Sequence, residues 1–142
     1  MENVVTTSYS AMMIANFIIS YCKENNFEIN NLRLQKLLYF VQGFYLVNND
    51  KLLFEDSIEK WRYGPVIPQV YHAFKSYGSD EINDVEDEII VIENNNSFSI
   101  EVQSYSSDNI KNNDIKFIEA IVTSLKEVDT FDLVEITHNQ QA

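Results

Sequence analysis

The first regular pattern of apolar positions lies between residues 10 and 24. Apolar side chains recur there at intervals of three and four residues, at Ala11, Ile14, Ala15, Ile18, Ile19 and Cys22. This spacing is typical of one face of an α-helix. Ser8 or Ser10 can cap the first turn, and Asn25-Asn26 interrupts the pattern at the other end. We therefore predict an amphipathic helix over this segment, with Cys22 as a small buried apolar side chain.

A second, longer apolar segment predicts a helix from about Asn31 to Asn48, capped by Asn30 or Asn31. Apolar residues occupy most of its sides, and a helix of that kind is usually buried among its neighbours. We therefore expect it to be the central helix of the fold. The polar exceptions within it are Arg33, Gln35, Lys36 and Gln42. The long side chains of Arg33 and Lys36 are expected to reach the rim with their charged ends.

From residue 51 to residue 66 the helical period is lost. The apolar run at 52–54 and the alternation at 58–63 predict extended chain, which closes in a turn at Tyr63-Gly64-Pro65-Val66. Pro68 suits the first turn of a third helix, because the N–H that proline lacks would have no hydrogen-bond partner within the helix there. Gly78 suits the end of that helix.

The last third of the chain predicts a hairpin and two further helices. Over residues 86–101, the run Ile89-Ile90-Val91-Ile92 and the alternating Phe98, Ile100 and Val102 flank an asparagine-rich turn at 94–96. A fourth helix follows, with Ile115, Ile118, Val122 and Leu125 on one face. Thr130 is expected to cap a last short helix, anchored by Phe131 and Val134.

The length of 142 residues suits one domain and a self-sufficient core. Low counts of Gly and Pro argue against an all-β protein with many tight turns. The predicted fold is therefore mostly α (α+β): a single compact domain over 1–142, with its core at about 10–138. We expect about five helices and a small antiparallel β element.

Charge limits the partners of this chain. Ten basic and 22 acidic residues give a formal charge of −12, which opposes binding to nucleic acids and to anionic membranes. No Lys or Arg occurs between Lys75 and Lys111. An electrostatic face for a basic partner is one interpretation of this block, and a merely solvated surface is the other; its candidate residues are Asp80, Glu81, Asp84, Glu86, Asp87 and Glu88. With no signal peptide or membrane-spanning run visible, a cytoplasmic location is expected.

Catalytic and metal-binding patterns are weak in this sequence. His72 and His138 are the two histidines, and they lack metal-ligand spacing. Cys22 is the single cysteine, so neither a disulfide within the chain nor a cysteine zinc cluster can form. On an apolar helix face its thiol is expected to be unreactive. We expect no enzyme activity, no cofactor and no metal.

The most distinctive feature is a concentration of aromatic and polar residues at 34–75. Trp, Tyr and Arg beside a rigid Gly-Pro bend are typical of anchor residues in protein interfaces. The other interpretation is that Trp61 and Tyr63 cover the core, with their polar ends hydrogen-bonded locally. The candidate partner-binding residues are Lys36, Tyr39, Trp61, Arg62, Tyr63, Gly64, Pro65, Tyr71 and His72.

An ordered set of motifs resembles one known family. The set comprises Met13-Ile14-Ala15-Asn16-Phe17-Ile18, Leu34-Gln35-Lys36-Leu37-Leu38-Tyr39-Phe40-Val41-Gln42-Gly43, Leu53-Phe54, Trp61-Arg62-Tyr63-Gly64-Pro65-Val66, Val70-Tyr71-His72-Ala73-Phe74, Tyr77-Gly78 and Leu133-Val134-Glu135-Ile136-Thr137-His138. In this order the motifs resemble the Panacea domain of SocA-like antitoxins and phage-associated GepA-type proteins. That family usually continues after Thr-His with an acidic stretch and Pro-Trp, where this chain has Asn139-Gln140-Gln141-Ala142.

The resemblance implies an antitoxin of a two-gene toxin–antitoxin module, which binds an unrelated toxin encoded by an adjacent gene. It also implies a mostly helical domain with a small β element, and for at least one relative an adaptor role that hands the toxin to a protease. Some relatives carry an added DNA-binding module that is not visible here, so direct nucleic-acid contact is not expected. The alternative function is an acidic phage-encoded decoy, whose carboxylates imitate DNA phosphates and occupy a host nucleic-acid-binding protein.

Overall fold

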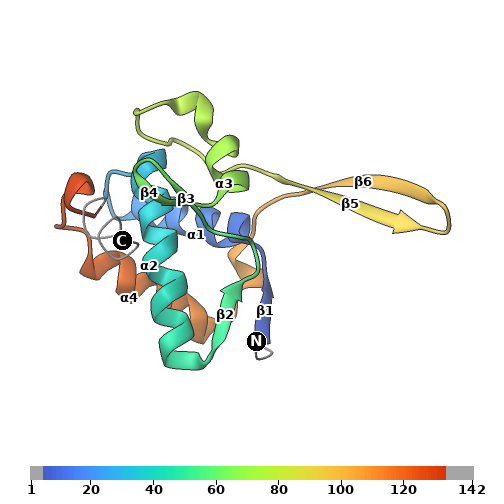
Figure 1. The fold of residues 1–142 in the computed structure, drawn as a ribbon, viewed down its shortest axis with the longest axis horizontal. Helices are drawn as coiled ribbons and strands as arrows, with labels where there is room; N and C mark the ends of the chain where they lie inside the picture. Colours follow the sequence, from blue (N-terminus) through green and yellow to red (C-terminus); the bar gives the residue numbers. More distant parts are fainter. Residues whose placement is uncertain (1–4, 134–142) are drawn as a thin grey trace.

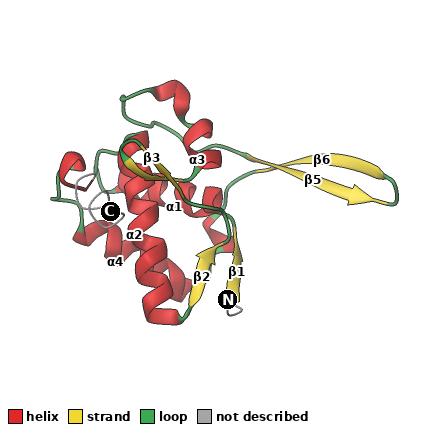
Figure 2. Ribbon diagram, viewed as in Figure 1, coloured by secondary structure: helices red, strands yellow, loops and turns green. Residues whose placement is uncertain are grey.

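The computed structural model of the chain describes residues 5–133. In chain order its elements are β1 (Val5–Tyr9), α1 (Ala11–Glu24), α2 (Asn31–Asn49), β2 (Lys51–Phe54), β3 (Glu59–Trp61), β4 (Gly64–Val66), α3 (Pro68–Ala73), the 3-10 turn η1 (Lys75–Tyr77), β5 (Glu88–Asn94), β6 (Ser97–Gln103), the 3-10 turn η2 (Ser107–Asn109) and α4 (Asn112–Ser124). Residues 130–133 are also helical. The predicted α+β fold of about five helices is confirmed (Figures 1 and 2). The expectations for Val134, His138 and the closing Thr-His motif lie outside the described residues.

Helix α1 forms where the apolar spacing predicts it. Ser10 is its N-cap, and the Ser10 Oγ accepts a hydrogen bond from the Met13 N–H at 3.1 Å. The predicted apolar face is fully or almost fully buried, and it comprises Ala11, Ile14, Ala15, Ile18, Ile19 and Cys22. Three-residue and four-residue spacing was therefore sufficient to locate this helix and its buried side.

Helix α2 is the central element, as predicted. It contacts α1, α3 and α4 as well as strands β2 and β4. Leu34, Leu37, Leu38 and Val41 on it are at most 1% exposed. The Asn30 side chain caps its first turn by accepting from the Arg33 N–H at 2.9 Å. Helices and strands therefore assemble around one buried helix rather than around a large sheet.

The strands form three separate two-stranded pairs among the described residues. The predicted antiparallel element is confirmed in β5–β6, and β3–β4 is a second antiparallel pair. Asn95 and Asn96 adopt positive φ angles of 37° and 70° at the β5–β6 turn, as tight hairpin turns require. The parallel β1–β2 pair was not predicted. A parallel pair needs a long crossover, and here α1 and α2 supply it.

A buried polar cluster joins three distant parts of the fold. The Tyr9 and Tyr45 hydroxyls donate to the two carboxylate oxygens of Asp114, at 2.8 and 2.9 Å. Burial and the neighbouring Asp114 raise the pKa of both tyrosines. Asp114 is 8% exposed and lies in the first turn of α4, where a carboxylate is also favoured by the helix dipole. The cluster ties the end of β1 and helix α2 to α4.

The last described helical turn differs from its prediction. Asp129, not Thr130, caps it: the Phe131 N–H donates to the Asp129 carboxylate at 3.0 Å, and the Leu133 N–H donates to the Asp129 carbonyl at 3.0 Å. Phe131 was expected to anchor the helix, yet it is 75% exposed, whereas Leu133 is 0% exposed. Because the helix is capped one residue earlier than predicted, Leu133 and not Phe131 faces the core.

Candidate partner-binding site

A short hairpin presents the predicted aromatic segment. In β3–β4, Trp61 pairs with Gly64 and Lys60 pairs with Pro65, so Arg62 and Tyr63 form the two-residue tip. Gly64 has φ of 103°, a conformation that favours glycine. The chain therefore reverses at Arg62-Tyr63, earlier than the predicted turn over residues 63–66, and Gly64, Pro65 and Val66 form a buried strand.

Polar residues of α2 hold this hairpin from beneath. The Gln35 Oε1 accepts from the Ile67 N–H at 2.8 Å, and the Gln35 Nε2 donates to the Asn31 Oδ1 at 3.0 Å. Asn31 in turn donates to the Tyr71 carbonyl at 2.9 Å. The Gln35 contact satisfies the Ile67 N–H, just before α3, and the Asn31 contact ties the start of α2 to α3.

Lys36 extends the same support and corrects two expectations. Its side chain is 0% exposed, so it neither reaches the rim of α2 nor lines a groove that a partner can enter. The Lys36 Nζ donates to the Pro65 carbonyl at 2.8 Å. Burial lowers the pKa of Lys36 to about 8, because desolvation disfavours the charged amine. Lys36 therefore supports the Gly64-Pro65 strand from inside the protein.

Above this support lies a groove of about 490 Å³. It runs between the β3–β4 hairpin, the start of α2 and the Asp129-capped helical turn. It brings together four of the predicted residues, Trp61, Arg62, Tyr63 and Tyr71. We call it the aromatic groove; its remaining lining residues are Asn30, Asn31, Leu32, Val66, Gly78, Ser79, Asp129, Thr130 and Phe131.

Ring contacts fix the floor and rim of the aromatic groove. The Trp61 and Tyr71 rings meet edge to face, with centroids 5.2 Å apart, and the Trp61 Nε1 donates to Glu59 at 2.9 Å. His72 does not line the groove, but its ring lies beside the Trp61 ring, with centroids 6.2 Å apart. The Arg62 guanidinium lies 5.5 Å from the centre of the Tyr63 ring. Tyr63 is 55% exposed, so its ring is available for contact.

The chain matches the family described as "Antitoxin SocA-like, Panacea domain" over residues 34–142. It belongs to this antitoxin family. A stretch of 71 residues is 39% identical to the Antitoxin SocA of Caulobacter vibrioides (strain NA1000 / CB15N), covering 50% of this chain and 38% of that protein. The aligned stretch is thus less than two fifths of the length of that relative. No solved structure gives a significant match.

Leu32 and Phe131 are among the lining residues of this SocA-like domain that sequence reasoning did not assign to the site. Phe131 was expected to anchor the last short helix, and Leu32 was covered only by the prediction of a helix from about 31 to 48. Phe131 lines the groove because the preceding Asp129 begins the helical turn, and no local pattern distinguishes that start from Thr130. Leu32 is placed there by the start of α2, whose cap was predicted at Asn30 or Asn31 and is Asn30. The match to the family, over residues 34–142, includes Phe131 and begins after Leu32.

Tyr39 lies apart from the other predicted residues. It lines a separate apolar hollow of about 230 Å³ on α2, together with Phe40, Phe44 and Ile58. Its ring packs edge to face on Phe40, with centroids 5.6 Å apart. Tyr39 follows Lys36 by three residues, but Lys36 is turned toward the buried β4 strand. The grouping of Tyr39 with the aromatic groove is therefore corrected.

The predicted acidic face contains residues in two different settings. Asp80, Glu81, Asp84, Glu86 and Asp87 are exposed, whereas Glu88 is half-buried and accepts from the Ser10 Oγ at 2.9 Å. The backbone of this acidic segment is hydrogen-bonded to the helical part of the protein. The Ile82 N–H donates to the Ile29 carbonyl at 2.8 Å, and Asn16 bonds both the N–H and the carbonyl of Glu86.

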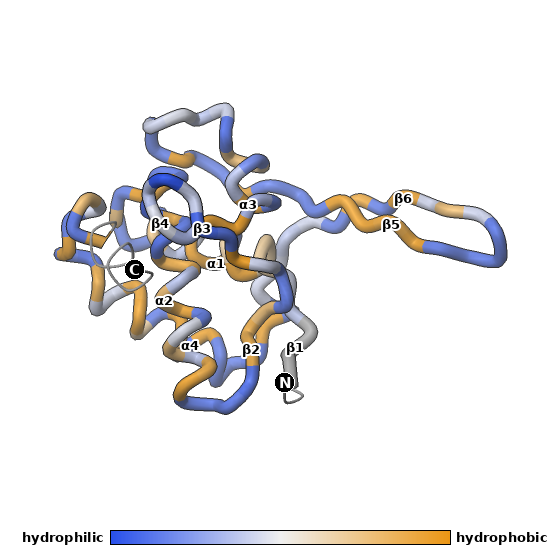
Figure 3. The backbone as a smooth tube through the Cα atoms, viewed as in Figure 1, coloured by the Kyte–Doolittle hydropathy of each residue, from blue (hydrophilic) through white to orange (hydrophobic). Residues whose placement is uncertain are grey.

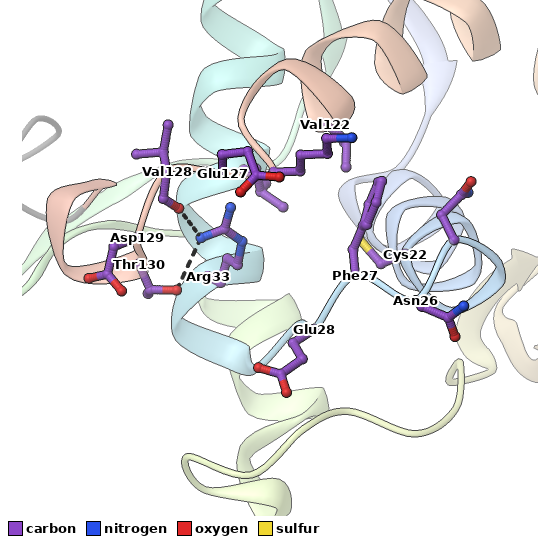
Figure 4. Close-up of a pocket in the computed structure, with 13 residues that line it drawn as sticks. Cys22, Asn26, Phe27, Glu28, Arg33, Val122, Glu127, Val128, Asp129 and Thr130 are labelled. Atoms are coloured by element: carbon purple, nitrogen blue, oxygen red, sulfur yellow. Dashed lines mark hydrogen bonds between the residues drawn. The ribbon is translucent and has the colours of Figure 1, made fainter.

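A further hollow of about 510 Å³ lies beside Cys22 and Arg33 (Figure 4). Arg33 is 9% exposed, and its guanidinium donates to the carbonyls of Leu125 and Val128, both at 2.7 Å, and to the Thr130 Oγ1 at 3.2 Å. It therefore holds the end of α4 and does not reach the rim as expected. Burial raises the pKa of the Cys22 thiol to about 11, so at neutral pH this thiol is protonated and a poor nucleophile.

Two kinds of feature are absent from residues 5–133. No group of three or more His, Cys, Asp and Glu side chains gathers as a metal site requires. Within the same residues, no helix combines the length and apolar character needed to cross a membrane.

Proposed function

We propose that this SocA-like domain neutralises a cognate toxin in the cytoplasm by direct protein–protein binding, and that the toxin is bound in the aromatic groove. The observation that carries the proposal is a concave, ring-lined surface, in which Tyr63 and Phe131 are 55% and 75% exposed. Trp, Tyr and Arg dominate the binding energy of many interfaces. Here Trp61, Arg62 and Tyr63 occupy adjacent positions on one hairpin.

Rigid support makes this surface suitable for tight binding. Gln35 and Lys36 hold the backbone on the β4 side of the groove through buried hydrogen bonds of 2.8 Å. A partner that binds a surface already ordered in the free protein loses less conformational entropy on association. The exposed carboxylates at 80–87 add a field that attracts a basic toxin surface and speeds the encounter.

The test is co-expression of this chain with the product of the adjacent gene. The wild-type chain should rescue growth and co-purify with that product. Tyr63→Ala and Arg62→Ala, at the exposed hairpin tip, should each raise the dissociation constant by about tenfold or more. Phe44→Ala is the matched control, because Phe44 is an exposed ring on α2 outside the groove. A harmless neighbour that forms no complex would refute the proposal.

The fate of the bound toxin distinguishes two mechanisms of neutralisation. The adaptor role implied by the resemblance predicts that co-expression shortens the half-life of the toxin in cells. Neutralisation by masking alone predicts an unchanged half-life with full growth rescue. Pulse-chase measurement of the toxin, with and without this chain, separates the two.

The exposed carboxylates also favour a second candidate, the DNA-mimicking decoy. The amide variants Asp84→Asn, Glu86→Gln and Asp87→Asn distinguish it from the antitoxin. A decoy should lose binding to its nucleic-acid-binding target when these charges are removed. An antitoxin should keep its complex and lose mainly association rate and salt sensitivity.

A further inference from the structure

The β5–β6 hairpin extends away from the helical body as a two-stranded arm (Figures 1 and 2). Its base is tied to the body where the Ser10 Oγ donates to Glu88. Beyond that point the strands pair with each other in a regular antiparallel register, from Glu88 opposite Gln103 to Asn94 opposite Ser97. The arm is therefore long and regular, although the body covers little of it.

One face of the arm is continuously apolar. Residues directly opposite each other share a face, and faces alternate along each strand. The register places Ile89 opposite Val102 and Val91 opposite Ile100, with Phe98 next along the same face. The exposed fractions are 68% for Ile89, 63% for Val91, 69% for Phe98, 70% for Ile100 and 64% for Val102. We call these five side chains the apolar face of the arm. Figure 3 shows stretches of hydrophobic residues along the backbone of the arm.

Such a face is unfavourable in a free monomer. Contiguous apolar patches larger than a few hundred Å² are rare on monomeric proteins and mark interaction sites. A lone two-stranded hairpin is also only marginally stable in water, because little apolar area is buried within it. Both considerations indicate that a partner completes this part of the fold.

The charge of the arm selects the chemistry of that partner. Glu88, Glu93 and Glu101 lie on the arm, and no Lys or Arg occurs anywhere between Lys75 and Lys111. Glu93 pairs with Phe98 and so lies at the end of the apolar face. A second copy of this chain would bring acidic residues against acidic residues, at an overall charge of −12 for each molecule. A basic surface, in contrast, would be attracted by these carboxylates.

We propose that the apolar face of the arm is a second docking surface for the toxin, and that it binds an apolar strip of the toxin bordered by Lys and Arg. The inference rests on the proposed function for the identity of the partner. The aromatic groove and the arm then contact the toxin at two separate places. The apolar face supplies affinity, and the carboxylates of the arm, with Glu93 at the end of this face, set the orientation and speed of the encounter.

The test uses the full chain and the purified product of the adjacent gene. The triple variant Ile89→Thr, Val91→Thr and Ile100→Thr removes apolar surface while keeping β-branched side chains that suit a strand. We expect the dissociation constant to rise about tenfold or more. The matched control is Ile90→Thr with Ile92→Thr, on the opposite face of β5, which should change affinity by less than about threefold.

Three outcomes decide between the inference and its alternatives. A triple variant that binds as tightly as wild type overturns the inference while the proposed function stands, provided that Tyr63→Ala still weakens binding. Equal losses in the triple variant and its control also overturn it, because the arm would then act through its own stability. Failure of the wild-type chain to bind the gene product refutes the proposed function and the inference with it.

Two further measurements test the charge argument and the choice of partner. Glu93→Gln with Glu101→Gln should slow association several-fold at low salt and have little effect at high salt, because salt screens exposed charges. Equal rates at low salt would contradict a basic border. Sedimentation of the chain alone should show a monomer; a concentration-dependent dimer lost in the triple variant would assign the apolar face to a second copy instead.

Discussion

The two antiparallel hairpins of this protein both expose large side chains, but they are stabilised in different ways. Below the β3–β4 tip, Gln35 and Lys36 on α2 hydrogen-bond the backbone of the chain from Pro65 to Ile67. The β5–β6 arm is tied at its base through Ser10 and Glu88 and then stabilised by its own ladder. A surface held from beneath is ordered before a partner arrives, whereas a surface held by its own pairing gains order from the partner. Substitutions of the residues that support the first hairpin should therefore lower stability, whereas substitutions on the arm should change binding with little effect on stability.

The largest effect on stability is expected from Gln35→Leu. The leucine is similar in size, but it leaves the buried Ile67 N–H without the acceptor that Gln35 now supplies at 2.8 Å. The free energy of unfolding should fall by about 1–3 kcal/mol, measured by urea denaturation. An unchanged denaturation midpoint would show that the hairpin does not depend on α2.

The next largest effect is expected from Gly64→Ala. At φ of 103°, a Cβ strains the backbone, and the unfolding free energy should fall by about 1–2 kcal/mol. Gly43→Ala is a useful control, because a Cβ at Gly43 meets no atom within 4 Å and alanine favours the helix. Thermal denaturation of both variants should show opposite shifts; the same direction of shift would contradict the role given to Gly64.

Lys36→Met should change how stability depends on pH. Burial lowers the pKa of Lys36 to about 8, below the ~10.4 of an exposed lysine. Between these values the unfolded chain binds a proton that the folded chain does not, so this residue makes stability rise with pH, by at most ~1.4 kcal/mol per pH unit. Cys22, whose pKa is raised to about 11, acts in the opposite direction.

Urea denaturation of wild type and Lys36→Met at several pH values between about 8 and 10 isolates this contribution, because Cys22 is common to both proteins. The difference between their unfolding free energies should change steadily with pH. A constant difference would show that Lys36 is not deprotonated inside the folded protein.

The smallest effect on stability is expected from Val91→Thr on the arm. Val91 is 63% exposed, and threonine keeps the branched shape that suits a strand. The unfolding free energy of the chain should change by less than about 0.5 kcal/mol. A loss as large as that of Gln35→Leu, measured under the same conditions, would remove the contrast between the two hairpins.

Much of the fold could be predicted from local patterns. The spacing of Ala11 to Cys22 located α1 and its buried side, and alternating residues around an asparagine turn located β5–β6. The parallel pairing of β1 with β2 was not predictable, because its partners are separated by two helices. The cap at Asp129 was missed because Asp129 and Thr130 are both good caps, and the Thr130 hydroxyl accepts a hydrogen bond from Arg33, a contact that only the tertiary structure creates.

The candidate site was predicted in part, and its members remain proposals. Trp61, Arg62 and Tyr63 were found together because they are adjacent in the chain, and Tyr71 joins them across the groove. Tyr39 and Lys36 were grouped with them by closeness in sequence, which does not say toward which side of a crowded helix each one points. On an amphipathic helix the polar side marks the exterior, but α2 is surrounded on most sides.

By itself the sequence determined the helices, the acidic character and the motifs shared with the family, because these follow from local spacing and composition. Only the tertiary structure decided which polar residues lie inside. Gln35, Lys36 and Arg33 are buried because backbone groups of β4, α3 and α4 need partners at those places, and that need arises only once distant segments are packed against α2. Within residues 5–133, the same packing leaves the apolar face of the arm uncovered, because none of the helices described around α2 extends over it.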